Sequence, residues 1–582
     1  MSQQATLFDI PTAHPPVMRI RRGYDLRDFQ REDADEILSA IDAGHRTILA
    51  VAATGLGKSV LLSELAEILS SKYRVLTTVD VGSLARDLSR SITYHTGEPC
   101  GVLTGDLKEN LDSRIIVSTI QTLYARCPHT KRKRYEWAFD TTQPWALLVD
   151  ECESAIAAEF LAVCRHFLDG NPSNILIGTT ATPMRGDKRG LGELFQYGRN
   201  EPGPLNRNIR WGCDNGWLVR PRQAFVRVSL DFSTLKVTKN ANGERDYKDE
   251  DLGKLLADEA ALREFAIGIH KLANGQASIV LVPTIDVAEK LTHHLCAVAG
   301  DGMANIATSR DKDGAIRDIE RFKRGDYPYL VSVSMLYKGF DADRVRFVFM
   351  GRKTQSQRIY TQALGRGTRP LLSIRQALAD AKDAVERNQI IANSDKPMMT
   401  MVDLVGIKPS VKDMTVLDVL GEVMPQEVRQ RAKSKMLEDP QEGELVDTEE
   451  AARDAAKDIA EEEKQRVEAE RRRRKSVQVD GYVDIEYTDN LTHSAPGRSM
   501  PSPSLIANLK RFGVSDPELA SMNEATMKAA NARIMKHVKN GLVSWKQART
   551  LRSFGYTKDQ LSNMKRADAR TLLDRLIGGK RA

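Results

Sequence analysis

Residues 47–59, TILAVAATGLGKS, constrain the fold more than any other stretch of the chain. The run Thr47–Val51 is apolar and β-branched, which predicts a buried strand. A glycine-rich turn follows it, Lys58 and Ser59 close the turn, and the apolar run VLLSELAEIL predicts a helix. A strand, a glycine-rich turn and a helix in this order typically cradle nucleotide phosphates, because backbone N–H groups and the helix N-terminus face the anion.

Each polar residue of this cradle has an expected role. Lys58 is expected to reach the β- and γ-phosphates of ATP, and Ser59 is expected to ligate Mg²⁺. Ala52 stands where the strict pattern GxxxxGK[ST] has its first glycine, so the flanking strand and helix carry part of the prediction. The residues expected to bind the nucleotide here are Thr54, Gly55, Gly57, Lys58 and Ser59.

Strands and helices alternate after the cradle, which predicts a parallel sheet covered by helices on both faces. The predicted strands are four apolar runs, at residues 74–80, 114–120, 145–151 and 174–182. The third run ends in Asp150 and Glu151, at the edge where an open α/β sheet binds its ligands. We therefore expect Asp150 to hold Mg²⁺ and Glu151 to deprotonate the attacking water. Gln30, upstream of the cradle, carries an amide that suits an adenine edge.

Charge is distributed unevenly along the chain. Residues 501–582 contain 16 lysines and arginines but 6 aspartates and glutamates, a net charge of +10, whereas the whole chain carries +7. A basic segment on a nearly neutral body favours an anionic partner such as nucleic acid. The six cysteines form no CxxC pair, so they indicate neither a zinc site nor a disulfide framework. Without a run of about 18 apolar residues or a signal peptide, the chain is expected to be cytoplasmic and to have no membrane partner.

Further short motifs follow the cradle in a fixed order. They are STIQT at 118–122, TAT at 180–182, YKGFD at 337–341 and QALGRGTR at 362–369. Together with Gln30, the cradle and Asp150-Glu151, they resemble motifs Q, I, Ib, II, III, V and VI of the DEAD/DEAH-like helicases of superfamily 2. The resemblance covers residues 21–425 and looks closest to bacterial and phage DNA repair helicases of the RadD and UvsW kind, which places the chain in a bacterial or phage-infected cell.

The resemblance implies two tandem RecA-like lobes that hydrolyse ATP between them. Its catalytic residues would be Lys58, Asp150, Glu151, Arg366 and Arg369, the two arginines coming from the second lobe to neutralise charge on the γ-phosphate. It also implies nucleotide contacts by Asp341 and Gln362, coupling of the lobes by Thr180 and Thr182, and nucleic-acid contacts by Thr119 and Gln121. Two positions depart from the pattern of the relatives, Glu153 in motif II and Lys338 in motif V.

The implied activity is that of an ATP-dependent DNA helicase or translocase in replication, recombination or repair. Two alternatives remain open. The chain would act on RNA as an RNA helicase, or its ATPase would be the motor or switch subunit of a larger nucleoprotein assembly of the restriction or defence type.

The C-terminal part contains an internal repeat. A shift of 42 residues aligns Phe512-Gly513 with Phe554-Gly555 and predicts two copies of a helix, a turn, a short helix and a longer helix. A protein-docking module is the alternative to nucleic-acid binding for this repeat. The residues expected to contact phosphate are Lys510, Arg511, Lys546, Arg549, Arg552, Lys565, Arg566 and Arg570.

These features predict an α/β protein with an all-α C-terminal repeat. Residues 1–20 are expected to form a flexible tail, in which Gln4–Phe8 resembles the peptide that docks on the bacterial sliding clamp. The remaining predicted parts are lobe 1 at 21–205, a connector at 206–250, lobe 2 at 251–425, a charged helical linker at 426–495 and a basic tandem helical repeat at 496–582.

Overall fold

The computed structural model describes residues 25–578 except for internal gaps, and forms two compact units, residues 1–455 and 456–582. Among the described helices, none is both long and apolar enough to cross a membrane. The internal gaps are 81, 155–157, 182–190, 192–193, 199–204, 240–244, 334–341, 409, 411, 422–423, 439–444, 475, 480–482, 487–500, 521 and 523.

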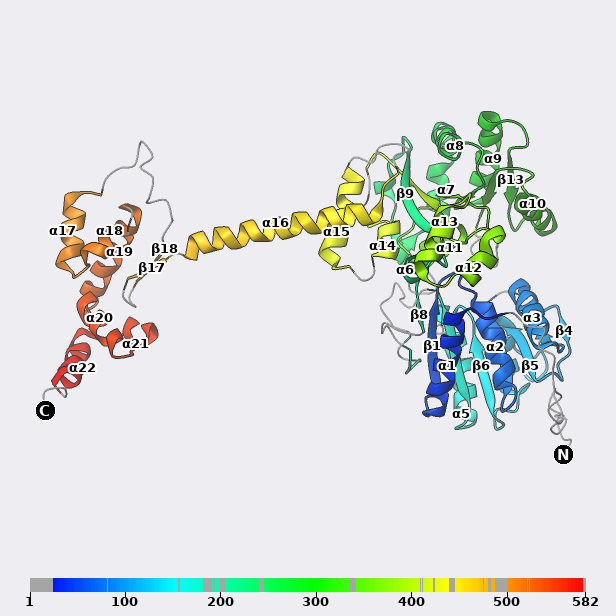
Figure 1. Ribbon diagram of the computed structural model, residues 1–582, viewed down its shortest axis with the longest axis horizontal. Helices are drawn as coiled ribbons and strands as arrows, with labels where there is room; N and C mark the ends of the chain where they lie inside the picture. The colour runs from blue at the N-terminus through cyan, green and yellow to red at the C-terminus, as the bar shows by residue number, and fades with distance from the viewer. Residues whose placement is uncertain are drawn as a thin grey trace. The chain divides into compact units, whose positions relative to one another are not determined.

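Lobe 1 is built on an eight-stranded sheet in the order β4-β3-β5-β2-β6-β7-β1-β8 (Figure 1). All neighbouring strands are parallel except β3 and β4. The four strands expected after the cradle are present at nearly the expected bounds. The strands are β1 (Thr47–Ala52), β2 (Arg74–Val79), β3 (Gly101–Leu103), β4 (Lys108–Glu109), β5 (Ile115–Thr119), β6 (Trp145–Val149), β7 (Ile175–Thr180) and β8 (Asn206–Arg207).

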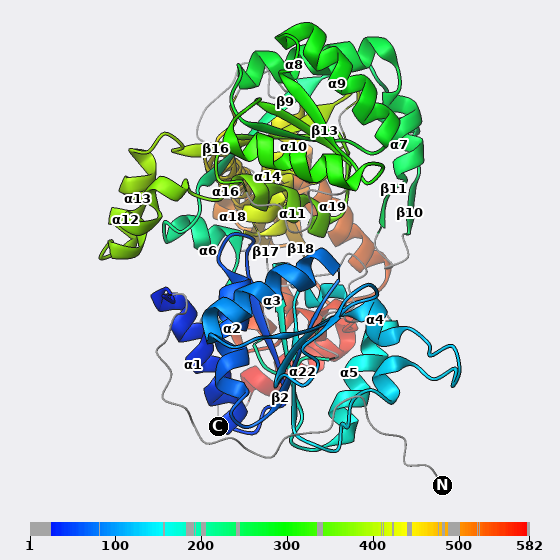
Figure 2. The same ribbon diagram turned by 90° about the vertical axis from the view of Figure 1, so that its right-hand side faces the viewer.

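Helices cover both faces of this sheet, which explains why its strands are continuously apolar. One core contains Ile37, Leu65 and Ile92 from α1 (Asp28–Asp42), α2 (Lys58–Leu69) and α3 (Gly82–Thr96). Figure 2 shows these three helices on the same side of the lobe. The other core contains Leu123 and Phe167 from α4 (Ile120–Tyr124) and α5 (Ala158–Gly170).

Lobe 2 has a second parallel sheet, in the order β13-β14-β12-β15-β16-β9. Its helices include α8 (Glu259–Ala273), α9 (Ile285–Ala299), α10 (Lys312–Arg324) and α11 (Gln357–Gly367). The two stacked α/β lobes confirm the predicted fold class. The strands are β9 (Arg220–Arg227), β12 (Ser278–Leu281), β13 (Ala304–Ala307), β14 (Tyr329–Ser332), β15 (Phe347–Met350) and β16 (Met398–Val405).

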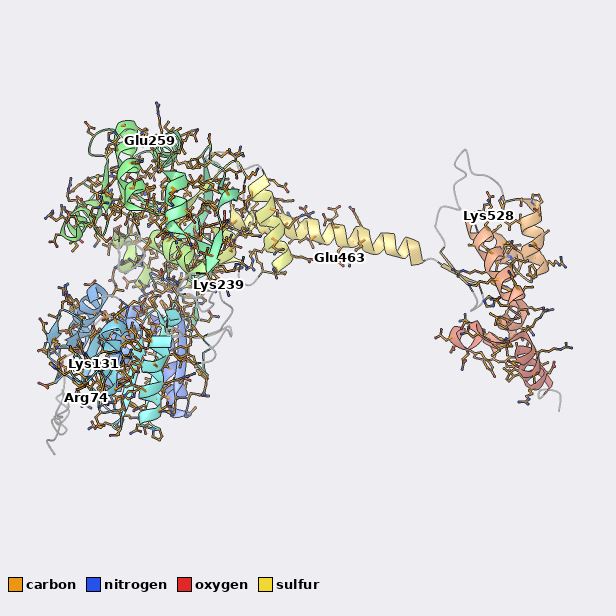
Figure 3. The ribbon with its side chains drawn as sticks, turned by 180° about the vertical axis from the view of Figure 1, so that it is seen from behind. Arg74, Lys131, Lys239, Glu259, Glu463 and Lys528 are labelled. Carbon is orange, nitrogen blue, oxygen red and sulfur yellow. The ribbon has the colours of Figure 1, made fainter. Side chains whose placement is uncertain are left out.

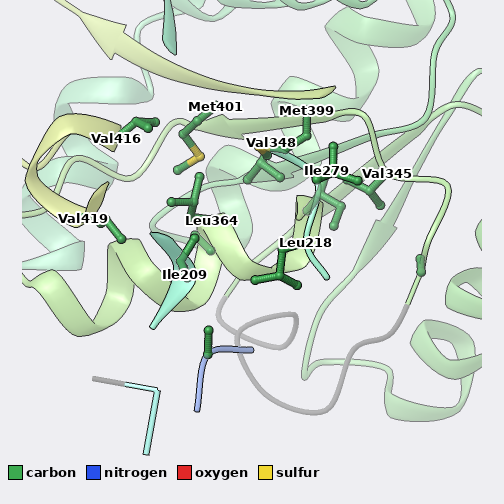
Figure 4. Close-up of a cluster of buried hydrophobic side chains, with 14 of the residues drawn as sticks. Ile209, Leu218, Ile279, Val345, Val348, Leu364, Met399, Met401, Val416 and Val419 are labelled. Atoms are coloured by element: carbon green, nitrogen blue, oxygen red, sulfur yellow. The ribbon is translucent and has the colours of Figure 1, made fainter. Parts of the chain in front are cut away.

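The segment expected as a connector is divided between the two sheets. Its first strand, β8, extends lobe 1 by pairing with β1, and β9 forms the edge of lobe 2 by pairing with β16. Between them, Ile209 and Leu218 enter a buried cluster that also contains Leu56 of the cradle and Leu364 of α11 (Figure 4). One apolar cluster therefore joins the cradle to the second lobe.

The segment predicted as a charged helical linker has a buried first part. Helix α15 (Gln426–Glu438) buries Ala432 and Met436 against Phe225, and Ala455 of α16 (Thr448–Arg474) joins the same cluster. Farther along α16 the Glu463 side chain is 59% exposed and stands away from the helix (Figure 3). The sequence did not predict this burial of α15 and the start of α16, because the apolar residues there are few and are separated by charged ones.

The second unit contains the predicted repeat, and the 42-residue shift holds for whole helices. Ser502 and Ser544 cap α17 and α20 through side-chain bonds to backbone N–H groups. Gly513 and Gly555 end these helices at φ +96° and +90°, a conformation that favours glycine. The two helix triplets are α17 (Pro503–Arg511), α18 (Asp516–Ala520) and α19 (Glu524–Lys539), then α20 (Trp545–Ser553), α21 (Lys558–Ser562) and α22 (Arg566–Gly578).

Candidate active site between the two lobes

The cradle has the backbone that phosphate binding requires. Gly55 and Gly57 have φ values of +95° and +85°, which side-chain-bearing residues rarely adopt. Gly57 caps α2, so the unpaired N–H groups of that helix begin at Lys58 and face the loop. The loop therefore fits a bound anion, with the helix N-terminus supplying partial positive charge.

Gln30 holds the loop from the outside. Its Nε2 donates to the carbonyl oxygens of Leu56 at 3.0 Å and Gly57 at 3.3 Å, and its Oε1 accepts from the backbone N–H of Arg27 at 3.0 Å. A Cβ atom on Gly57 would lie 2.6 Å from Nε2, so glycine is needed for this contact as well. In this arrangement both amide hydrogens serve the loop, and an adenine contact by Gln30 stays a prediction.

The acidic residues after β6 face the cradle. Lys58 Nζ lies 3.0 Å from Glu151 Oε1, and the Thr179 hydroxyl donates to Asp150 Oδ1 at 3.0 Å. Glu151 has a φ of +50°, a left-handed conformation that costs about 1–2 kcal/mol for a residue with a side chain. This strained turn directs the carboxylate back toward Lys58.

Burial and neighbouring charges set the ionisation of this group. Burial, followed by the Glu151 charge, raises the pKa of Asp150 to about 6. Burial also acts to raise the pKa of Glu151, but Lys58, followed by a hydrogen bond with Glu153 and the Arg366 charge, outweighs it and holds this pKa below its usual value. For Lys58, burial is outweighed by the carboxylates of Glu151, Asp150 and Glu153, so its pKa is raised.

These charges fit a divalent cation. Three carboxyl groups surround one lysine in a buried site, and Glu151 Oε2 is buried with no hydrogen-bond partner among the described residues. Oxygen ligands of this kind suit Mg²⁺, which usually binds through one or two protein groups together with substrate phosphates. Ser59, at the start of α2, and Asp150 are the residues that would hold it.

Glu153 links three motifs within this site. The Thr180 hydroxyl donates to Glu153 Oε2 at 2.7 Å, and Gln362 Nε2 lies 3.5 Å from Glu153 Oε1. All three side chains are at most 4% exposed. The residue that departs from the family pattern thus bridges β7 of lobe 1 and α11 of lobe 2. Gln362 contacts Glu153 here, and its expected contact with the nucleotide stays a prediction.

The pKa of Glu153 leads to a stability prediction. Burial, and then the Glu151 charge, raise this pKa to about 8, far above its value in the unfolded chain. The folded protein therefore retains a proton that the unfolded chain has lost, and wild-type stability should fall as pH rises from about 4.5 to 8. Glu153→Gln cannot ionise, so its Tm relative to wild type should be higher at pH 8.5 than at pH 5, measured without nucleotide or Mg²⁺. The exposed Glu159→Gln is the control, and an equal Tm difference at both pH values would contradict the prediction.

Lobe 2 supplies arginines to the same site through α11. Arg366 is 6% exposed and contributes to the lowered pKa of Glu151, so its charge lies close to that carboxylate. A Cβ atom on Gly365 would lie 2.6 Å from Thr54 Cβ, and one on Gly55 would lie 3.0 Å from Arg369 Cγ. The glycines of motif VI and of the loop thus allow the two lobes to approach at this point.

Other expected site residues lie elsewhere or outside the described residues. Thr119 is buried and caps α4 by accepting from the Thr122 N–H, whereas Gln121 is exposed. Thr182, Lys338, Asp341 and the peptide Gln4–Phe8 lie outside the described residues.

The basic residues expected to contact phosphate belong to the second unit and divide into two groups. Arg549 contacts both carboxylate oxygens of Glu518 at 2.7 Å, and Lys510 pairs with Asp516. Arg511 and Lys546 are exposed. A Cβ atom on Gly513 would lie 3.7 Å from Lys546 Cβ, so Lys546 of the second copy lies beside the turn that follows α17.

Two family profiles match the chain. Residues 23–185 match the type III restriction enzyme res subunit, and residues 258–370 match the helicase conserved C-terminal domain. These segments contain the cradle with Asp150-Glu151 and the helix with Arg366, so each profile covers one side of the site.

Curated relatives share lower identity over a longer stretch. IRC3 of Saccharomyces cerevisiae, named provisionally as an ATP-dependent helicase, is 24% identical over 432 residues, which are 70% of this chain and 58% of that protein. The EcoAI type I restriction enzyme endonuclease subunit of Escherichia coli is 23% identical over 374 residues, 60% of this chain and 44% of that protein. The chain thus spans about half the length of the curated relatives it matches.

Solved structures with a similar chain trace include proteins bound to nucleic acid. Lhr of Mycobacterium smegmatis, bound to single-stranded DNA and AMP-PNP, has a TM-score of 0.39 at 16% identity, covering 72% of this chain and 50% of that one. Dbp5 of Saccharomyces cerevisiae, bound to RNA and ADP BeF3, has a TM-score of 0.41 at 12% identity, covering 66% and 84%.

Proposed function

We propose that this chain, which belongs to the DEAD/DEAH-like helicases of superfamily 2, uses ATP hydrolysis between its lobes to move along or remodel DNA. One observation carries the proposal. Lys58 Nζ lies 3.0 Å from Glu151 Oε1 in lobe 1, and the buried Arg366 of lobe 2 adds to the positive charge that, led by Lys58, holds the pKa of Glu151 below its usual value. A base and two cations gathered from two lobes suit the hydrolysis of a phosphoanhydride.

We assign each side chain of the site a separate role in hydrolysis. The loop N–H groups and Lys58 bind the phosphates of the substrate ATP. Ser59 and Asp150 would hold Mg²⁺, which would supply positive charge against the phosphates. As Lys58 turns from Glu151 to the phosphate oxygens, the Glu151 carboxylate becomes available to accept a proton from the attacking water. Arg366 and Arg369 stabilise the negative charge that develops on the transferred phosphoryl group.

Glu153 is suited to transmit the state of the nucleotide site between lobes. It accepts from Thr180 in lobe 1 and faces the Gln362 amide in lobe 2. A change in the charge around Glu151 therefore reaches both lobes through two hydrogen-bond contacts. This supports a motor in which lobe closure and hydrolysis are linked.

DNA is the nucleic acid that we propose, with RNA as the first alternative. Support comes from the basic second unit, in which Arg511 and Lys546 are exposed and Lys546 of the second copy lies beside Gly513 of the first. Basic side chains that contact phosphate supply most of the sequence-independent affinity for nucleic acid. A protein partner for this unit, and a switch role in a larger assembly, are the competing proposals.

The deciding experiment measures ATP hydrolysis by the full chain alone, with single-stranded DNA, with forked duplex DNA or with RNA. We expect DNA to stimulate hydrolysis and Glu151→Gln to remove both the basal and the stimulated rate. Stimulation by RNA alone would favour the RNA helicase. Equal rates with and without every nucleic acid would contradict the motor and favour the switch subunit.

A double substitution tests the basic unit separately. Arg511→Ala with Lys546→Ala should weaken binding to duplex DNA and make the slope of log K against log salt shallower by about 0.9 for each phosphate that these side chains neutralise. Lys254→Ala with Lys271→Ala removes the same charge from exposed positions of lobe 2 and is the matched control. Binding isotherms at several salt concentrations measure the slope, and equal slopes for the two variants would refute a phosphate-binding role for Arg511 and Lys546.

A further inference from the structure

A second set of metal-binding side chains lies in lobe 1, away from the cradle. Glu64 and Glu67 stand one turn apart on α2, and His95 lies in the last turn of α3. One ligand atom from each residue lies within 4.8 Å of the other two. His95 is 3% exposed and Glu64 is 6% exposed, so two of the three ligands are fully enclosed.

The distances in the cluster are close to those of a metal centre. His95 Nε2 lies 2.6 Å from Glu64 Oε2 and 3.4 Å from Glu67 Oε2. Around a tetrahedral Zn²⁺, ligand atoms at about 2.0–2.1 Å from the metal are separated by roughly 3.3–3.4 Å. The Glu67–His95 distance already matches this value, and the Glu64–His95 distance needs to lengthen by less than about 1 Å.

Glu67 gives a second and independent indication. Its Oε2 atom is buried and has no hydrogen-bond partner among the described residues, although it points at the His95 ring. A buried carboxylate oxygen without a hydrogen bond is unfavourable, and a metal ion would remove this cost. The Glu67 side chain as a whole is 19% exposed, which leaves a route of entry for an ion from solvent.

We propose that Glu64, Glu67 and His95 bind a divalent transition-metal ion of the zinc class that fastens α2 to α3. Imidazole nitrogen with two carboxylates is a donor set for zinc, cobalt or manganese rather than for Mg²⁺, which prefers oxygen ligands alone. Solvent water completes the coordination on the exposed side of Glu67. The Ser63 and Ser91 hydroxyls, 3.2 Å apart, join the same two helices beside the site.

The site has a mechanical connection to the cradle through α2. This helix begins at Lys58 and Ser59, and the Ser63 hydroxyl donates to the Ser59 carbonyl at 2.7 Å. A metal one turn beyond Ser63 would hold the phosphate-binding helix against α3 whether or not nucleotide is present. The role is structural, and it does not depend on the proposed function of the chain.

Cobalt absorption tests the site on the full chain after treatment with EDTA and without nucleotide. Wild type should bind one equivalent of Co²⁺ with visible d–d bands, lose the bands on addition of Zn²⁺ but not of millimolar Mg²⁺, and show a higher Tm with Zn²⁺. His95→Ala and Glu67→Gln should abolish binding of this equivalent. Asp150→Asn, which alters the nucleotide site, and the exposed Glu109→Gln should keep it.

Glu67→Gln is the decisive variant because it preserves shape at a partly exposed position, even if His95→Ala fails to fold. Equal Co²⁺ binding by Glu67→Gln and wild type would overturn the proposal. So would the absence of binding by wild type, or a thiolate charge-transfer band, which would assign the metal to cysteine.

Discussion

Arg366→Ala is expected to lower kcat for ATP hydrolysis by about 10³–10⁵, with a much smaller change in KM for ATP. Arg366 comes from lobe 2, is almost fully buried and acts electrostatically on Glu151 of lobe 1. A guanidinium in this position stabilises charge that exists mainly in the transition state, so its removal affects kcat more than substrate binding. Steady-state kinetics over a range of ATP concentrations measures both constants.

Two variants define what this result means. Arg366→Lys keeps the charge but not the planar fork, and its rate should lie between wild type and Arg366→Ala. Arg358→Ala, on the same helix, should hydrolyse ATP within about threefold of wild type if helix α11 is intact. A fall of less than tenfold for Arg366→Ala would show that another cation serves the transferred phosphoryl group.

Glu151→Gln has the second large expected effect, a fall of about 10²–10⁴ in kcat. Glutamine has the same shape but cannot accept a proton from water, and Lys58 remains to bind phosphate. Binding of ATP should therefore be retained, and single-turnover measurements should show that the hydrolysis step itself is slow.

The neighbouring Glu159→Gln, on the exposed side of α5, is the matched control. It should leave both binding and hydrolysis unchanged. If Glu151→Gln hydrolyses ATP at the wild-type rate, proton transfer from water is not limited by this residue and the assignment of the base is wrong.

Much of the fold could be predicted because local signals and tertiary packing agree. The strand that ends at Val149, directly before Asp150, and the cradle helix that begins at Lys58 lie within two residues of where their apolar runs predict. The helix ends at Phe512 and Phe554 follow from glycines whose φ values leave little choice of residue. In these segments, the residues that suit the local backbone conformation are also the ones that suit the packing.

Long-range contacts of polar residues could not be predicted in the same way. The sequence shows Glu153 as an unusual residue, but its contact with Gln362 joins positions 209 residues apart. Glu67 and His95 likewise meet only because α2 packs on α3. The burial of α15 could not be predicted because it depends on packing against Phe225, which lies far away in the sequence on strand β9.

The presence of two repeat copies affects how the affinity of the second unit would depend on the length of a ligand. Each copy has its own capped helix and its own buried leucine, Leu509 or Leu551, and Lys546 of one copy lies beside the turn of the other. A short anionic ligand would occupy one copy, whereas a longer one would occupy both and benefit from the second, now intramolecular, binding event. If the second unit binds nucleic acid as proposed, its affinity would therefore depend on the length of the bound strand rather than on the order of its bases.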